Sequence, residues 1–258
     1  MKPEFAGQTA QLYARYRRDL PALQAGELAD LMGLLEDDVV IDLGCGTGQL
    51  SVPLSAYCAG VVGIDPEPQM LAGLHARHQR SVMCVLGDDG DLPTLAPLLA
   101  GPVGAVVVGN ALHWMDAPVA LQACADLLRP GGAVGILTQG PPLWLGAASW
   151  QVRVRQVLDE RLGPVSSTCG SDVAALNERV EVLEGLGLEV RVETWHASYE
   201  MDADWVLGHL GSALSSKTLQ DEDPGGLAHA LRAALDEHRA EVMHEDVTTT
   251  AVIARQPR

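Results

Sequence analysis

The stretch VVIDLGCGTG, residues 39–48, decides the fold of this 258-residue chain. Its first five residues are apolar except for Asp42 and predict a short buried strand. Three glycines follow at alternate positions: Gly44, Gly46 and Gly48. Glycine permits positive φ and a close approach of the backbone to a ligand, and the helix expected over 48–58 offers free N–H groups at its start. Because doubly wound folds bind ligands at the carboxyl end of such a strand, the stretch predicts a ligand-binding turn.

The same alternation of apolar runs and helical stretches continues along the chain. We expect further strands at 61–65, 82–87, 103–109, 132–138, 188–200 and 244–256. Helices are expected at 67–78, 116–129, 149–162, 172–185, 202–216 and 225–243, with a turn at 221–226. Nearly continuous apolar strands between amphipathic helices indicate a parallel sheet covered on both faces. Pro53 is a local conflict, because inside the helix 48–58 it removes a backbone donor and is expected to kink it.

The spacing of the glycines bears on the ligand. A dinucleotide site has GxGxxG, whereas this turn has GxGxG with Asp42 two residues ahead of it. A second acid, Asp65, ends the next strand 17 residues after Gly48. A carboxylate there can accept hydrogen bonds from both hydroxyls of a ribose. Asp65 is also a candidate N-cap before Pro66, an interpretation that is compatible with the ribose contact.

Three further segments complete a family resemblance. LGDDGDLP (86–93) follows the third strand, VVVGNALHWMDAPVALQACADLLRPGGAVGI covers 106–136, and YARYRRDLP covers 13–21. Together with the glycine turn and Asp65, they resemble class I S-adenosylmethionine-dependent methyltransferases. The segment 13–21 resembles the entry helix of a small-molecule group related to ubiquinone-type and trans-aconitate methyltransferases, although Arg18 stands where that pattern usually has proline.

The resemblance implies a cofactor, S-adenosylmethionine, and residues that hold it. These are Tyr13, Arg17, Asp42, Gly44, Gly46, Asp65, Pro66, Met70, Gly87, Asp88, Asp89 and Asn110. Asp42 would orient the ammonium group and Asp65 the ribose. Asp88 would take the adenine amino group and the backbone N–H of Asp89 the ring. Met70 would lie against the adenine face, or else belong to the core.

The resemblance also predicts the layout of the chain. It implies an α/β, doubly wound Rossmann-like sheet of about seven strands, mostly parallel with an antiparallel last strand, plus helical lid elements. We expect a single methyltransferase domain over 1–258. Within it, 1–35 would form N-terminal lid helices, 36–139 the cofactor-binding half and 140–258 the substrate side with further lid helices.

His113 is the candidate catalytic residue. Methyl transfer requires alignment and exclusion of water, and a base only where the nucleophile carries a proton. His113 follows the fourth strand, where the acceptor is expected, and imidazole titrates in the range of a general base. The alternative is that His113 and Trp114 only pack against the lid.

No metal is expected. Gly109 and Asn110 stand where metal-dependent catechol-type enzymes have an aspartate, and the histidines form no metal-ligand pattern. The segment Asn110–Leu112 also lacks the Asn/Asp-Pro-Pro-Tyr/Phe motif of enzymes that methylate nucleic-acid or amide nitrogens. Five scattered cysteines predict reduced thiols rather than a disulfide framework.

Composition restricts the partners. A net charge of −17 repels polyphosphates, so nucleic acid is a poor substrate. All five tryptophans follow residue 113 and could line a pocket for a ring-bearing metabolite, or anchor the covering helices instead. The substrate-binding candidates are Tyr16, Trp114, Trp144, Trp195 and Trp205.

The function predicted is methylation of an oxygen or nitrogen atom of a small, specialised metabolite. The alternatives are a C-methyltransferase of quinone or polyketide type and a protein that binds the cofactor without transferring methyl. A nicotinamide dehydrogenase is disfavoured by the glycine spacing. No apolar run is long enough to span a membrane, and the first residues lack the apolar stretch of a signal peptide. We therefore expect a cytoplasmic protein. For the oligomeric state, a monomer and a homodimer both stay open.

Overall fold

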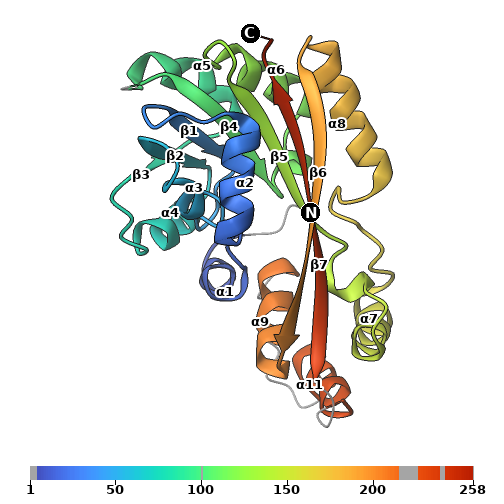
Figure 1. Ribbon diagram of the computed structural model, residues 1–258. Helices are drawn as coiled ribbons and strands as arrows, with labels where there is room; N and C mark the ends of the chain where they lie inside the picture. Colours follow the sequence, from blue (N-terminus) through green and yellow to red (C-terminus); the bar gives the residue numbers. More distant parts are fainter. Residues whose placement is uncertain (1–4, 100, 215–225, 239–241, 258) are drawn as a thin grey trace. The chain divides into compact units, whose positions relative to one another are not determined.

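The computed structural model describes residues 5–99, 101–214, 226–238 and 242–257 (Figure 1). The chain forms two compact units. The first contains residues 18–138, 170–195 and 249–258, and the second contains residues 1–17, 139–169 and 196–248. We call them the sheet unit and the helical unit.

Seven strands form one sheet in the order β3-β2-β1-β4-β5-β7-β6. They are β1 Val39–Leu43, β2 Gly60–Asp65, β3 Val82–Leu86, β4 Val103–Gly109, β5 Ala133–Gly140, β6 Glu189–Met201 and β7 Met243–Arg255. The strands from β3 to β5 pair in parallel, and the last strand, β7, is antiparallel. The predicted doubly wound, seven-stranded sheet is therefore confirmed. The outer halves of β6 and β7 belong to the helical unit.

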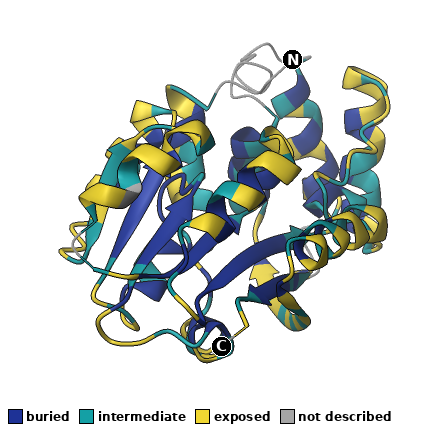
Figure 2. Cartoon of the chain, turned by 90° about the horizontal axis from the view of Figure 1, so that it is seen from above, coloured by how far each residue is buried: buried dark blue, intermediate teal, exposed yellow. Residues whose placement is uncertain are grey.

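Both faces of the sheet are covered, which explains why its strands are apolar without alternation. Ile41 and Leu43 pack with α6 (Ala117–Asp126) and α8 (Val173–Gly185) on one face. Val40 points to the other face of the sheet, where it packs in a cluster with residues of α2 and α3. Figure 2 shows the buried strands between the more exposed helices. Two hydrophobic clusters thus fix the strands that carry the glycine turn.

The other elements of the sheet unit are short. They are α2 Ala22–Met32, α3 Ser51–Leu54, α4 Pro68–His75, α5 Leu92–Leu95 and the 3-10 turns η1 Asp89–Asp91, η2 Ala96–Leu98 and η3 Leu112–Trp114.

The predicted helix over 48–58 is wrong in its bounds, because α3 has only four residues. It begins at Ser51, so Pro53 lies in its first turn, where a missing N–H removes no intrahelical bond. Pro53 therefore limits where the helix starts and does not kink it.

The helical unit contains α1, α7, α9 and α11. Their bounds, with the 3-10 turn η4, are α1 Gln8–Tyr16, η4 Leu143–Leu145, α7 Ser149–Leu162, α9 Ala203–Ala213 and α11 Leu227–Asp236. The helix predicted at 149–162 is confirmed. The helices predicted at 202–216 and 225–243 extend beyond the described residues, and of the turn predicted at 221–226 only Gly226 is described. A cluster that includes Trp144, Trp150 and Leu210 forms the core of this unit.

Among the described residues, no helix is both long enough and apolar enough to cross a membrane.

Candidate functional site

The glycine turn leaves β1 with the backbone that its sequence predicts. Gly44, Gly46 and Gly48 have φ values of 70°, 55° and 90°, a region that other residues rarely adopt. The N–H groups of Gly44 and Cys45 both donate to the carbonyl of Ile64, at 2.8 and 3.0 Å. A Cβ on Gly44 would lie 2.5 Å from the Cβ of Ala111. The turn is therefore held against β2 and against the segment that follows β4.

Asp65 connects this turn to the end of β2. Its Oδ2 accepts a hydrogen bond of 2.9 Å from the N–H of Gly46, and its Oδ1 accepts one of 2.9 Å from the N–H of Glu67. Burial raises the pKa of Asp65, and these two bonds oppose the rise. Each oxygen has a second lone pair, so the carboxylate is still able to accept hydroxyl donors. The two predicted cofactor elements thus form one bonded unit.

The interpretation of Asp65 as the cap of the next helix is wrong. Glu67 caps α4, because its side chain accepts from the N–H of Gln69 and Pro68 occupies the first turn. Pro66 lies exposed between the strand and the cap, and Met70 is buried on α4. Asp65 therefore does not cap the helix itself: one of its oxygens holds the N–H of Glu67 and the other holds the glycine turn.

Asp42 lies beneath the turn. Its side chain is buried, and the hydroxyl of Ser51 donates to its Oδ2 at 2.5 Å. Burial, with a smaller contribution from the charge of Asp65, raises the pKa of Asp42 to about 7. A cationic ligand group would stabilise the ionised form. The ammonium contact that the family resemblance implies remains a prediction.

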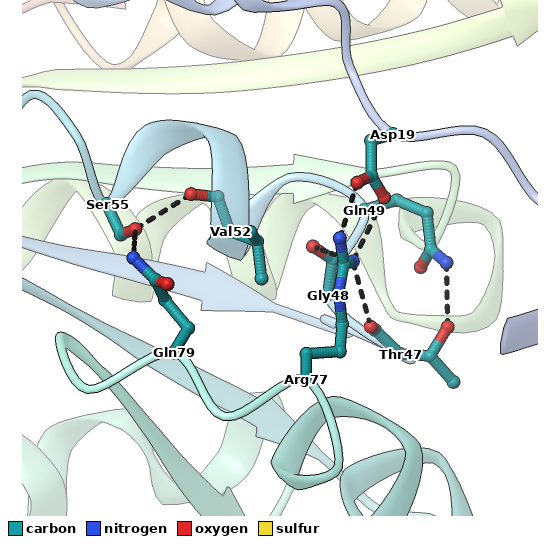
Figure 3. Close-up of polar contacts among 8 residues, drawn as sticks. All are labelled: Asp19, Thr47, Gly48, Gln49, Val52, Ser55, Arg77 and Gln79. Carbon is teal, nitrogen blue, oxygen red and sulfur yellow. Dashed lines mark hydrogen bonds and ion pairs between the residues drawn. The ribbon is translucent and has the colours of Figure 1, made fainter.

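A clamp on the glycine turn was not predicted from the sequence. The guanidinium of Arg77 donates to the carbonyls of Thr47 and Gly48, at 3.3 and 3.0 Å, and forms an ion pair with Asp19 (Figure 3). Gln49 also donates to the hydroxyl of Thr47, at 2.7 Å. These contacts fix the carbonyls of the turn on one side. The ion pair of Arg77 joins residues 58 positions apart, and its bonds to the turn carbonyls join residues 30 and 29 positions apart, so no local pattern could have indicated them.

The acids after β3 form a small cap. The side chain of Asp88 accepts from the N–H of Gly90, and that of Asp91 accepts from the N–H of Asp88. A Cβ on Gly87 would lie 2.7 Å from Oδ2 of Asp91, so a larger residue there would displace that side chain. Asp89 is the first residue of η1, so its N–H has no acceptor within that turn. These positions agree with a site for a nucleobase at the end of β3, and the adenine contacts themselves stay predictions.

The segment after β4 carries the candidate base. Asn110 has a positive φ of 51°, and its N–H donates to the carbonyl of Leu137 at 2.9 Å. His113 follows on η3 as an exposed residue, with its ring centroid 4.6 Å from that of Trp114. Desolvation, and then the positive charge of Arg179, lower the pKa of His113. The imidazole is thus kept neutral near pH 7, as a general base requires.

The predicted residues near the N-terminus belong to the helical unit. The guanidinium of Arg17 lies 5.1 Å from the ring centroid of Tyr13, and its Nε donates to the hydroxyl of Ser212 at 2.8 Å. Tyr16 meets the ring of Trp205 edge to face, with centroids 6.4 Å apart. These contacts attach α1 to α9. The roles of these residues toward cofactor and substrate remain predictions.

The remaining tryptophans divide between core and surface. Trp144 and Trp150 are buried in the core of the helical unit, which favours the anchoring interpretation for both. Trp195 donates to Oε2 of Glu27 at 2.6 Å within the sheet unit. Trp114 is 39% exposed and is therefore the tryptophan of the sheet unit that is most available to a ligand.

Among the described residues, no cluster of three or more His, Cys, Asp or Glu side chains is suited to hold a metal ion. For the organic cofactor, the glycine turn and the acids after β2 and β3 provide a fitting set of groups. The turn admits no Cβ at Gly44, and Asp65 retains acceptor capacity beside it. These residues fit S-adenosylmethionine in the sheet unit.

The strand order, the GxGxG turn and the acid that ends β2 define an α/β cofactor-binding domain of methyltransferase type. Residues 40–132 match the family described as "Methyltransferase domain". This segment is a methyltransferase domain of the S-adenosylmethionine-dependent type.

Curated relatives agree with this family. The chain is 35% identical over 148 residues to an uncharacterized methyltransferase of Mycobacterium tuberculosis, a match that covers 56% of this chain and 52% of the relative. It is 35% identical over 121 residues to a ubiquinone biosynthesis O-methyltransferase of Cupriavidus pinatubonensis, covering 46% and 48%. The chain thus spans about half the length of these curated relatives.

A solved structure shares the fold. An S-adenosylmethionine-dependent methyltransferase from Thiobacillus denitrificans, solved with S-adenosylhomocysteine, superposes with a TM-score of 0.54. The match covers 97% of each chain at 18% sequence identity, so it concerns the fold alone.

Proposed function

We propose that this protein transfers a methyl group from S-adenosylmethionine to an oxygen or nitrogen atom of a small metabolite. The observation that carries the proposal is the bonded unit of the glycine turn and Asp65, joined through the N–H of Gly46. S-adenosylmethionine, when bound, supplies a methyl group on a sulfonium centre with a good leaving group. The residues of the chain then bind the cofactor, orient the acceptor and remove the proton of the acceptor.

Each group has a defined task in this proposal. Asp65 accepts hydrogen bonds from the ribose hydroxyls, and Asp42 accepts them from the ammonium group. The N–H of Asp89 donates to the adenine ring. His113, on η3 after β4, would take the proton of a hydroxyl acceptor as the oxygen–methyl bond forms and the methyl–sulfur bond breaks. Its lowered pKa supports this role, because a neutral imidazole is present at pH 7.

An oxygen acceptor is favoured over nitrogen or carbon. The relative from Cupriavidus pinatubonensis is named as an O-methyltransferase, and a hydroxyl needs the base that His113 offers. The net charge of −17 supports a small molecule rather than nucleic acid. The five cysteines, all free, support work in a reducing compartment such as the cytoplasm. No resident metal is required for these steps.

Calorimetry tests the cofactor part of the proposal. We expect S-adenosylmethionine and S-adenosylhomocysteine to bind and NAD and NADP not to bind. Tight NAD binding without binding of the sulfonium compound would contradict the proposal. Release of S-adenosylhomocysteine in the presence of a panel of small hydroxyl and amine acceptors then separates a transferase from a protein that only binds the cofactor.

A further inference from the structure

Arg179 is a buried cation that makes no hydrogen bond to the residues that the structure describes. It lies on α8, on the same side as Leu176 and Leu183, which pack into the core beneath the sheet. Its residue surface is only 6% exposed, yet its guanidinium donates no hydrogen bond to any residue within the described ranges. Burial lowers the pKa of Arg179, although the charges of Asp172 and Glu178 oppose this effect.

The guanidinium points toward the start of α8 and toward His113. A Cβ on Gly170 would lie 2.5 Å from Nη2 of Arg179 and 3.9 Å from the Cβ of His113. The two side chains therefore meet around this glycine, whose φ is 75°. One of the two acids whose charge acts on Arg179, Asp172, accepts a hydrogen bond at its Oδ1 from the N–H of Ala175 and so caps the helix.

Such an arrangement contributes little to the fold. Taking a cation largely out of water without a hydrogen bond to the described residues costs stability. The guanidinium nitrogens are not among the fully buried polar atoms that lack a partner, so they stay open to a ligand. The guanidinium has five N–H donors in a planar fork, which matches the two oxygens of a carboxylate. The free donors of Arg179 are thus directed at the region where His113 would receive the acceptor. A ligand anion would supply the missing partner.

We propose that Arg179 binds a carboxylate group of the methyl acceptor beside His113. This inference rests on the proposed function, and it names the substrate class as small carboxylic acids. A single carboxylate is favoured over phosphate, because one guanidinium in a chain of net charge −17 compensates one negative charge better than two. The exposed ring of Trp114, which packs on His113, offers a surface for the apolar part of the same molecule.

Benzoate and benzamide test the inference, because they share shape and differ in charge. Both are titrated by calorimetry into the protein saturated with S-adenosylhomocysteine, so that failure of cofactor binding is seen separately from failure at Arg179. We expect benzoate to bind about tenfold or more tightly than benzamide, the effect of a hydrogen bond to a charged group. In Arg179→Met this preference should vanish, while cofactor affinity stays unchanged.

Arg191→Met is the matched control, because Arg191 lies in the same unit with its side chain 64% exposed. It should keep the preference for benzoate. The melting temperature of Arg179→Met should equal or exceed that of the wild type, since an unpaired buried charge is removed; a lower one would instead indicate a structural role.

A measurement on the wild type guards against a variant that fails to fold. Benzoate should raise the pKa of His113, followed by its imidazole proton resonances, because it neutralises the charge of Arg179 beside the ring; benzamide should not. Equal binding of the two probes, no binding of benzoate, or a preference that survives in Arg179→Met would each overturn the inference.

Discussion

The backbone N–H of Gly46 donates a hydrogen bond of 2.9 Å to Oδ2 of Asp65. The acid that we assign to the ribose therefore also fixes the turn that we assign to the methionyl part of the cofactor. Because one carboxylate serves both elements, its removal should affect the whole cofactor site, whereas the core on either face of the sheet does not depend on it.

Asp65→Ala should weaken the binding of S-adenosylhomocysteine by about 1.5–3 kcal/mol, the range for hydrogen bonds to a charged group. Calorimetry measures the loss, and circular dichroism shows whether the variant is folded. Asp65→Asn is the control, because its amide oxygen preserves one acceptor and should preserve part of the affinity. Full affinity in a folded Asp65→Ala protein would mean that the ribose contact lies elsewhere.

Asp42 makes the stability of the unliganded protein depend on pH. Its pKa is about 7 in the folded chain and about 3.9 when unfolded. The protonated form therefore stabilises the fold at low pH, and this contribution is lost as the pH rises through 7. The melting temperature of the wild type, measured relative to that of Asp42→Asn, should therefore fall by several degrees between pH 5 and pH 8. About 1 kcal/mol corresponds to roughly 2–4 °C.

The same carboxylate should make cofactor binding depend on pH. If Asp42 accepts the ammonium group, the affinity for S-adenosylhomocysteine should rise between pH 6 and pH 8 as Asp42 ionises, by about tenfold or more. Asp42→Asn should show neither the rise nor the high affinity. A variant that binds as tightly as the wild type at pH 8 would assign Asp42 to Ser51 and the turn alone.

His113→Ala should lower turnover by about 10²–10⁴-fold, the contribution of a positioned proton transfer, with little change in cofactor affinity. Desolvation by neighbouring atoms and the charge of Arg179 lower the pKa of His113, so the acidic limb of the wild-type kcat profile should fall below pH 6.5. The limb should disappear in the variant. A loss of less than about tenfold with the limb intact would assign His113 to packing with Trp114.

Chelation tests the expectation that no metal takes part. Turnover should survive EDTA, since the residues near the end of β4 are Gly109, Asn110 and His113, without a carboxylate of the metal-dependent type. Initial rates with and without EDTA, and after addition of Mg²⁺, measure this. Loss of turnover that Mg²⁺ restores would require a metal site and would contradict the expectation.

The sequence by itself determined the strands, the glycine turn and the order of the acids along the sheet. These features are local: a buried parallel strand is apolar along its whole length, and a turn with positive φ needs glycine. For this reason β1 and β4 were predicted with the correct bounds, and Asp65 at the end of β2. The first helix was predicted too long, because the glycine turn extends to residue 50 before α3 begins.

Only the tertiary structure decided which distant groups meet. The ion pair of Arg77 with Asp19, the bond from Gly46 to Asp65 and the position of Arg179 beside His113 join residues separated by 19 to 66 positions. Hydrophobic periodicity depends on neighbours within one or two turns of the chain, so it carries no information about such pairs. They are set by how the helices pack on the sheet, and the charge beside His113 is therefore a property of the fold.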